Sequence, residues 1–543
     1  MAYDKDPGKP DIKEVVMQTT TLFRKLLVIV LALWVGGFAM AAGQTEPAAT
    51  RSDVGFNEIG FPIVDEPITL SLFGIRQANR PQWEELSFFH AMEEKTNISF
   101  TYETPIGTAY RERKSILFAS GMIPDLFFGV DFTEGDITQF SSQGALLPLN
   151  DLLDRYMVEL QGHMESNEEI RRAITTADGN IYALPRIIEI PFDVTEKTWI
   201  RTEWLDTLGL SMPTTLDEFY DVLVAFRDGD PNQDGQRDEI PLTSAGIGRL
   251  RHAMLAPFGI LWLSGFPMLD ADAGGTLSYI PAMDEFREYL TFMNRLYREE
   301  LLDNNIFTNT DPELAAIGRE QRLGVYPHAA PFLYNEYDNN ELYSALSPLA
   351  RRAGEPRIWP RHNGVQNGRA VLSSTNPHPE ATVRWLDYLY SVEGSQLVDQ
   401  GPEGFSWQWV DATRDRWVQN SVESRAEGTP GVAGMTPGIR LSYWISRLDV
   451  PHALHLYRET TANYVPYWEF MVPRMVLSDA DQRRVTAILA DMDPYVEQIE
   501  ARFITGEEPL TDARWQAHLR VLEQMGIRDL VRIYQQAYTA YHR

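Results

Sequence analysis

The stretch PITLSLFGI, residues Pro67–Ile75, decides the fold, because its apolar and polar side chains alternate as in a β-strand. Residues 82–97 carry apolar side chains at helical spacing, and ISFTYET (Ile98–Thr104) predicts a second strand. A predicted helix over about 110–120 then leads to PDLFFGV (Pro124–Val130), a short apolar run typical of a buried parallel strand. The alternation of strands and helices predicts a layered α/β architecture with right-handed crossovers.

The chain is too long for one hydrophobic core. Its 543 residues predict at least two lobes. The later sequence becomes more helical, with apolar residues on one face of 283–302 and again of 379–398. Helical patterns separated by short breaks fill 479–543, so we expect a helix-rich C-terminal part.

Charge and cysteine content exclude several functions. The formal net charge of −29 disfavours nucleic acid and anionic membrane surfaces as partners, and is compatible with neutral sugars, cationic ligands or a divalent metal. The absence of cysteine excludes disulfides, thiolate zinc sites, iron–sulfur clusters and a cysteine nucleophile. It also excludes a lipid anchor on an N-terminal cysteine.

The N-terminus predicts an export signal over residues 1–41, with Met1 or Met17 as the initiator. Arg24 and Lys25 precede the apolar run 26–40, and Ala39-Met40-Ala41 fits a small-x-small cleavage site. The alternative is a membrane-anchoring helix, although the run is shorter than the ~20 residues that a span needs. Residues 42–65 lack periodicity and are predicted to be a linker.

The loop DPNQDGQRDEIP (230–241) predicts a Ca²⁺ site. It offers hard oxygen ligands at alternate positions, a backbone carbonyl at the seventh position and a glycine at the sixth, as a calcium loop requires. The predicted ligands, with Glu239 in place of the usual distal glutamate, are Asp230, Asn232, Asp234, Gln236, Asp238 and Glu239. A polar turn without metal and a catalytic metal are the alternatives. The closed oxygen set favours a structural calcium, since it leaves no open position for substrate.

Four segments together resemble extracellular solute-binding protein family 1 of bacterial ABC importers. They are ILFASGMIPDLFFG (116–129), TTADGNIYALPR (175–186), the 199–243 segment with WLDTLGL, PTTLDEF and the calcium loop, and 374–409 with PEATVRWLDYLYSVEG. The resemblance covers roughly 67–409 and is greatest to the large branch that includes alginate-oligosaccharide-binding proteins, whose equivalent loop holds structural calcium. The sequence departs from many relatives in lacking a lipobox cysteine.

The resemblance implies a two-lobed type 2 periplasmic-binding-protein fold, with both lobes α/β. The expected lobes are 66–186 plus 374–445 for lobe 1, and 187–373 plus 446–543 for lobe 2, which contains the calcium loop 230–239. The expected crossovers lie at Arg186–Asp193, at Ala370–Ser374 and near 440–450.

The implied function is the capture of a carbohydrate, most simply an oligosaccharide, in the interlobe cleft for delivery to the membrane permease of an ABC importer. The expected protein is a periplasmic monomer without chemistry of its own, either released or held by an uncleaved signal anchor. A secreted polysaccharide-degrading enzyme with a structural calcium site is the alternative. The predicted ligand-binding residues follow strand ends, lie at the first crossover or occupy aromatic loops: Asn79, Asp131, Tyr182, Arg186, Trp262, Glu403 and Trp407.

Overall fold

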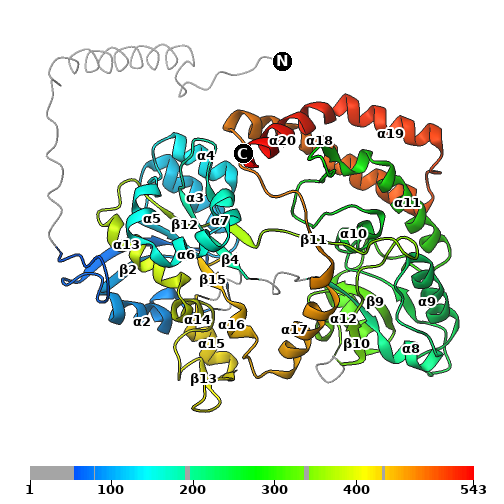
Figure 1. Cartoon of the computed structure of the whole chain (residues 1–543), viewed down its shortest axis with the longest axis horizontal. Helices are drawn as coiled ribbons and strands as arrows, with labels where there is room; N and C mark the ends of the chain where they lie inside the picture. The colour runs from blue at the N-terminus through cyan, green and yellow to red at the C-terminus, as the bar shows by residue number, and fades with distance from the viewer. Residues whose placement is uncertain (1–53, 79, 190–195, 336–340, 431–434, 543) are drawn as a thin grey trace, which may run out of the picture. The chain divides into compact units, whose positions relative to one another are not determined.

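The computed structural model describes residues 54–78, 80–189, 196–335, 341–430 and 435–542 (Figure 1). The predicted signal peptide 1–41 and the predicted ligand-binding residue Asn79 lie outside the described residues. Two separate sheets form the framework of the described chain.

The first sheet has six strands in the order β15-β4-β12-β3-β1-β2. Their bounds are β1 (Ile68–Phe73), β2 (Ile98–Glu103), β3 (Leu126–Phe128), β4 (Ala183–Ile188), β12 (Val365–Leu372) and β15 (Gly438–Arg440). β1 pairs in parallel with both β2 and β3, so the strand pattern predicted for 67–130 is confirmed.

The second sheet has four strands in the order β10-β5-β9-β6. Their bounds are β5 (Lys197–Arg201), β6 (Ile240–Leu242), β9 (Leu323–His328) and β10 (Tyr343–Ala345). Three strand pairs stand apart: β7 (Leu269–Ala271) with β8 (Leu277–Tyr279), β11 (Trp359–Arg361) with β16 (Trp468–Phe470), and β13 (Trp407–Trp409) with β14 (Trp417–Gln419).

Helices connect the strands throughout the described chain. Up to β9 they are α2 (Ser87–Thr96), α3 (Thr108–Ser120), α4 (Glu134–Ser142), α5 (Asn150–Tyr156), α6 (Val158–Ser166), α7 (Glu168–Ile174), α8 (Thr202–Leu208), α9 (Leu216–Asp228), α10 (Ile247–Leu255), α11 (Asp284–Arg298) and α12 (Asp311–Arg319). After β12 they are α13 (Pro379–Asp387), α14 (Val392–Gln400), α15 (Val422–Gly428), α16 (Ser442–Ile445), α17 (Pro451–Asn463), α18 (Asp479–Thr505), α19 (Asp512–Met525) and α20 (Ile527–Tyr541).

The first sheet is buried on both faces. Successive residues of a strand point to opposite faces, and the core follows this rule. Leu126 and Phe128 of β3 belong to one buried cluster, whereas Phe127 belongs to another. A strand buried on both sides reads as a continuous apolar run, which explains the LFF sequence of β3.

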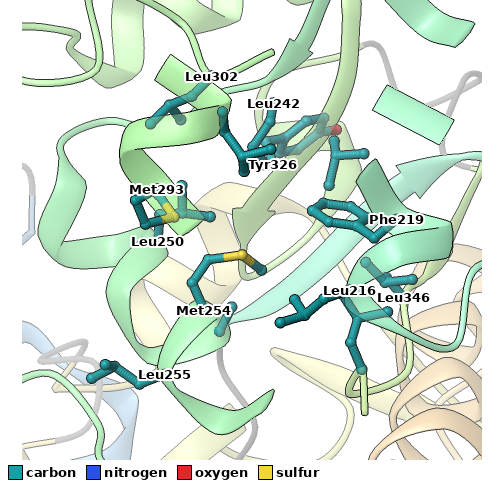
Figure 2. Close-up of a cluster of buried hydrophobic side chains, with 14 of the residues drawn as sticks. Leu216, Phe219, Leu242, Leu250, Met254, Leu255, Met293, Leu302, Tyr326 and Leu346 are labelled. Atoms are coloured by element: carbon teal, nitrogen blue, oxygen red, sulfur yellow. The ribbon is translucent and has the colours of Figure 1, made fainter. Parts of the chain in front are cut away.

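The second sheet packs its strands against α9, α10 and α11. Figure 2 shows Phe219, Leu242, Leu250, Met293 and Tyr326 gathered in this cluster, and all five are fully buried. The start of α9 is fixed locally by the TTLDE sequence, because the Thr215 side chain accepts a hydrogen bond from the backbone N–H of Glu218 at 3.2 Å.

The C-terminal helices share a third core with β7 and β8, as the predicted helix-rich C-terminal part requires. α18 also packs along α11. Within the described ranges, no helix has the length and apolar character that crossing a membrane demands.

Two predicted boundaries differ from the structure. The described part of the predicted linker, 54–65, is folded: Ile63 and Val64 are fully buried, and Phe56 bridges Val64. The predicted lobe-1 segment starts at 374, yet β12 (365–372) pairs with β3 and β4 of the first sheet. The crossover therefore precedes β12 instead of lying at Ala370–Ser374. The polar start of β12 and its bulge hide the strand pattern in the sequence.

Candidate ligand-binding site

In each of the two sheets, several strands end or begin at the same edge of that sheet. In the first sheet, β12 runs antiparallel to β3 and β4, so β1, β3, β4 and β15 all point the same way. In the second sheet β6 and β9 are parallel, and β5 is antiparallel to β9. Open α/β sheets bind ligands beyond the carboxyl ends of their parallel strands. A ligand site is therefore expected next to the ends of β4, β6 and β9 and the starts of β5 and β12.

The first such cavity, here called the β11–β16 cavity, has a volume of about 550 Å³. It lies next to the starts of β5 and β12 and the end of β6, and both strands of the β11–β16 pair line it. Its lining residues are Glu196, Ala245, Gly248, Arg249, His252, Leu263, Ser264, Phe266, Trp359, Pro360, Arg361, His362, Gln366, Trp468 and Arg474.

Aromatic rings form much of this cavity wall. Trp359 and Trp468 are partners in the parallel register of β11 and β16. The Trp359 ring meets the His252 ring edge-on at 5.5 Å between centroids, and the Arg474 guanidinium lies 4.7 Å from the centre of the Phe266 ring. The buried indole N–H of Trp468 has no hydrogen-bond partner among the described residues.

Arg249, in the first turn of α10, organises the polar side of the cavity. Its Nε lies 3.0 Å from Glu196 Oε1, and its Nη1 lies 2.6 Å from Asp311 Oδ1. The hydrogen bond from Arg249 lowers the pKa of Asp311, whereas burial raises the pKa of Glu196. Burial also lowers the pKa of His252 to about 4, so this imidazole is neutral near pH 7.

The second cavity, the α17 cavity, has a volume of about 340 Å³. It lies beyond the end of β9 and next to the start of β5, and α14, α16 and α17 contribute to its wall. Its lining residues are Lys197, Ala329, Phe332, Ser395, Gln396, Asp399, Gln400, Trp417, Gln419, Ile439, Arg440, Leu441, Trp444, Ile445, Leu448, Val450, His452, Ala453, Leu456, Tyr457 and Thr460.

Buried charges and amides accompany the rings of the α17 cavity. Asp399 accepts two hydrogen bonds from Arg186 Nη2, at 2.9 and 3.1 Å. Burial lowers the pKa of Lys197 to about 7. The Nε2 atom of Gln396, a residue that is 3% exposed, has no partner among the described residues. The lining of the α17 cavity therefore includes the Trp417 and Trp444 rings and an amide without a partner in the described chain.

Three of the predicted ligand-binding residues lie in or next to the first sheet, and their side chains form hydrogen bonds with other side chains. Asp131 accepts from Arg369 Nη1 at 2.6 Å, and the Tyr182 hydroxyl donates to Asp178 at 2.9 Å. Arg186 is buried and holds Asp399. None of the three lines either cavity, although Arg186 positions Asp399, which does.

The other three described candidates also lie behind or outside the cavity walls. The Trp262 indole donates to the Phe266 carbonyl at 3.1 Å, and Glu403 is exposed. Trp407 is buried and packs edge-on against Trp417 and Trp444 of the α17 cavity wall. Direct contact of a solute with any of the seven residues stays a prediction.

The sequence predictions missed Trp359, Trp468 and Arg249, which line the β11–β16 cavity. Both tryptophans lie on three-residue strands, which form a two-stranded pair within the described chain. Strands this short carry no periodic signal, and their partners are more than a hundred residues apart in the chain. Only the tryptophans in WPR and YWEF could have pointed to this wall.

The predicted calcium loop folds back on its own carboxylates. The backbone N–H of Gly235 donates to Asp230 Oδ2 at 3.2 Å, and that of Gln236 donates to Asp234 Oδ1 at 2.7 Å. Gly235 has φ +80°, which glycine adopts without strain. The loop is therefore a tight turn closed by acidic side chains.

Four oxygens of this loop are buried without a hydrogen-bond partner among the described residues: Asp230 Oδ1, Asp238 Oδ1 and both Glu239 carboxylate oxygens. Burial, together with the charges of Asp230 and Asp238, raises the pKa of Glu239. Across the described residues, no three acidic, histidine or cysteine side chains form a metal-binding group by themselves. An ion in this loop would also need amide and backbone oxygens, such as those of Asn232 and Gln236.

The sequence has relatives of known function. Residues 77–396 match the family described as bacterial extracellular solute-binding protein. The fructooligosaccharide ABC transporter substrate-binding protein FusA of Streptococcus pneumoniae is 26% identical over 528 residues, covering 92% of this chain and 96% of that protein. The polygalacturonan/rhamnogalacturonan-binding protein YtcQ of Bacillus subtilis is 24% identical over 394 residues, covering 70% and 73%.

Solved structures match over nearly the whole described chain. FusA in complex with kestose aligns with a TM-score of 0.71 at 25% identity, covering 88% of this chain and 99% of that one. A FusA EF-hand mutant in complex with fructo-nystose aligns with the same values. A solute-binding protein from Bifidobacterium longum infantis reaches a TM-score of 0.75 at 20% identity, covering 88% and 99%, and shows the shared fold.

Proposed function

Because residues 77–396 match it, the chain belongs to the family of bacterial extracellular solute-binding proteins, and we propose that it delivers an oligosaccharide to an ABC importer. These comparisons confirm three predictions made from the sequence: the family, the two-lobed α/β fold and an extracytoplasmic location. The solute class is proposed from the cavities and from the saccharides that FusA and YtcQ are named for.

The composition of the β11–β16 cavity carries the proposal. Sugar rings present C–H faces that pack on aromatic rings, and their hydroxyls need charged or planar polar groups. Trp359, Trp468 and Phe266 supply the rings, while Arg249 and Gln366 supply the polar groups. A site with both kinds of group suits a saccharide better than a fully apolar or a fully charged ligand.

The two cavities flank the start of β5 and support a closing mechanism. Glu196 lines the β11–β16 cavity, and the next residue, Lys197, lines the α17 cavity. Residues next to both sheets line each cavity, so a bound solute would favour the closed arrangement of the lobes. In this proposal the closed form docks on a membrane permease, a separate subunit hydrolyses ATP, and this chain performs no bond chemistry.

The proposal places the protein in the periplasm as a monomer. The 1–41 segment would direct export, and the absence of cysteine leaves no site for a lipid anchor at its end. Retention by an uncleaved signal anchor is the other outcome, and N-terminal sequencing of the exported protein would separate the two.

We also propose that the 230–239 loop binds a structural Ca²⁺ ion. Its buried carboxylate oxygens without partners support this, because unpaired buried carboxylates are costly unless a cation compensates them. The ligands would be Asp230, Asn232, Asp234, Gln236, Asp238 and Glu239. None of these residues lines the β11–β16 or α17 cavity, so the ion would stabilise the fold without touching the solute.

Titration calorimetry of the purified protein against fructo-, malto-, galacturono- and alginate-oligosaccharides tests the proposal. We expect saturable binding of at least one series, with the saccharides recovered intact by chromatography. Shortened products would instead support a secreted polysaccharide-degrading enzyme. Absence of binding to every series would contradict the proposed solute class.

Trp468→Ala is the matching variant. It removes a ring from the cavity wall, so we expect affinity to fall about tenfold or more. Trp515→Phe is the control, because Trp515 is buried in the core and lines neither cavity. If the two variants bound the saccharide with equal affinity, the β11–β16 cavity would not be part of the binding site.

A further inference from the structure

A third cavity, here called the α7–α20 cavity, has a volume of about 1,130 Å³. Arg171 of α7 and Thr175 just after it line one side, and Ile533, Ala537 and Tyr541 of the C-terminal helix α20 line the other. Figure 1 shows the C-terminal end of α20 next to α7, and the Tyr541 hydroxyl donates to Glu169 of α7 at 2.7 Å. This volume has no role in the function proposed above.

Arg474 connects this cavity to the β11–β16 cavity, because it lines both. A second connection runs through Tyr541, whose hydroxyl accepts from Asn363 Nδ2 at 3.3 Å. Asn363 stands in the chain between His362 and Gln366, which line the β11–β16 cavity. These two independent contacts show that the α7–α20 cavity and the β11–β16 cavity lie next to each other.

The walls of the α7–α20 cavity suit a saccharide chain. Met475, Ile533 and Ala537 offer apolar surface for sugar C–H faces. Arg171 and Gln536 offer polar groups to hydroxyls, and the ion pair of Arg171 with Asp154 is long, at 3.8 Å. The walls thus combine aliphatic surface with polar groups, whereas the β11–β16 cavity combines aromatic rings with polar groups.

We infer that the solute is a saccharide chain long enough to run from the β11–β16 cavity past Arg474 into the α7–α20 cavity. The inference rests on the proposed function and adds a subsite and a length class to it. Sites for small ligands measure about 300–1,000 Å³. The β11–β16 cavity alone falls in this range, and the α7–α20 cavity alone exceeds it.

A length series tests the inference. Calorimetry would compare the disaccharide, tetrasaccharide and hexasaccharide of the fructo- and galacturono-oligosaccharide series. Ala540→Trp places a bulky ring at an exposed position of the α7–α20 cavity wall. Thr539→Trp is the matched control, because Thr539 is the exposed neighbour on the same helix and lines neither cavity.

For wild type and Thr539→Trp, we expect the hexasaccharide to bind about tenfold or more tightly than the disaccharide. For Ala540→Trp, we expect this gain to disappear while disaccharide affinity and melting temperature stay unchanged. Equal affinity at all lengths, or a gain that survives in Ala540→Trp, would overturn the inference and leave the proposed function standing. Failure of every saccharide to bind would instead contradict the proposed function.

Discussion

Glu500 has a fully buried side chain, and its partners explain how the protein tolerates it. Both carboxylate oxygens accept from Arg251, and Oε1 also accepts from the Tyr289 hydroxyl at 3.0 Å. These residues come from α18, α10 and α11, so the ion pair ties the C-terminal helices to the core of the second sheet.

Removing this carboxylate leaves a buried guanidinium without compensation. We expect Glu500→Ala to lower the free energy of unfolding by about 3–5 kcal/mol. Asp512→Ala is the control: its carboxylate pairs with Arg287 but is 91% exposed, so the expected loss is about 1 kcal/mol or less. Urea denaturation measures both values, and equal losses would show that the buried pair is not a structural tie.

His252 makes stability depend on pH. Its pKa is about 4 in the folded protein, below the ~6.5 of an unfolded chain, so folding favours the neutral ring. The stabilisation is present above pH ~6.5 and is lost as pH falls toward 4. We expect wild type to lose about 2 kcal/mol more than His252→Phe between pH 7 and pH 5. Parallel pH dependences in denaturation experiments would contradict this.

Single residues were the hardest feature to predict from sequence. Tyr182 and Arg186 were expected at the first crossover; Arg186 lies within β4 and Tyr182 directly before it, and their side chains are occupied by Asp399 and Asp178. A strand position predicts where a residue lies, whereas its free hydrogen-bonding capacity depends on neighbours that are distant in the chain.

At the scale of elements, the 230–239 loop is the clearest case for metal binding. We expect Ca²⁺ to raise the melting temperature and a chelator to reverse the change, since a ligand of the folded state alone stabilises it. Asp230→Asn combined with Asp238→Asn should abolish the response, because it removes two carboxylates with unpaired buried oxygens.

Asp272→Asn provides the calcium control. Asp272 caps the exposed turn between β7 and β8, where Oδ1 accepts from the N–H groups of Gly274 and Thr276, both at 2.8 Å. An amide oxygen can make the same contacts, so the calcium response should persist. A wild-type melting temperature that ignores both Ca²⁺ and chelator would rule out the site.

The bulge of β12 requires glycine at position 368. Gly368 has φ +77°, and a Cβ atom there would lie 2.0 Å from the Phe132 carbonyl oxygen. We expect Gly368→Ala to cost about 1–3 kcal/mol of unfolding free energy or more. Gly354→Ala, at φ +86° with nothing within 4 Å of the added Cβ, should cost only the backbone strain, about 1–2 kcal/mol. A smaller loss in Gly368→Ala than in Gly354→Ala would contradict this reading of the bulge.

Regular elements were predicted well, and irregular ones were not. The strands at 68–73 and 98–103 carry period-two or continuous apolar patterns that the sequence displays directly. β12 was missed as part of the first sheet because Gln366, Asn367 and Gly368 break that pattern. The buried segment 63–64 was predicted as linker, since a segment without periodicity gives no sign that the core covers it.

At the scale of the whole molecule, the order of the four sequence motifs predicted the family. The residues of the candidate binding cavity could be identified only from the three-dimensional structure. The β11–β16 cavity combines Glu196, Arg249, Trp359, Gln366 and Trp468, which span more than half of the chain. No local pattern connects such residues. Net charge disfavoured nucleic acid and anionic membrane surfaces as partners, but it could not indicate which cavity receives the solute.

The position of a bound oligosaccharide in a crystal structure of the complex tests the central claim most directly. We expect an intact saccharide against Trp359 and Trp468 in the β11–β16 cavity, within reach of Arg249 and Gln366. A saccharide bound on an outer surface away from these residues, or one cleaved in the cavity, would contradict it.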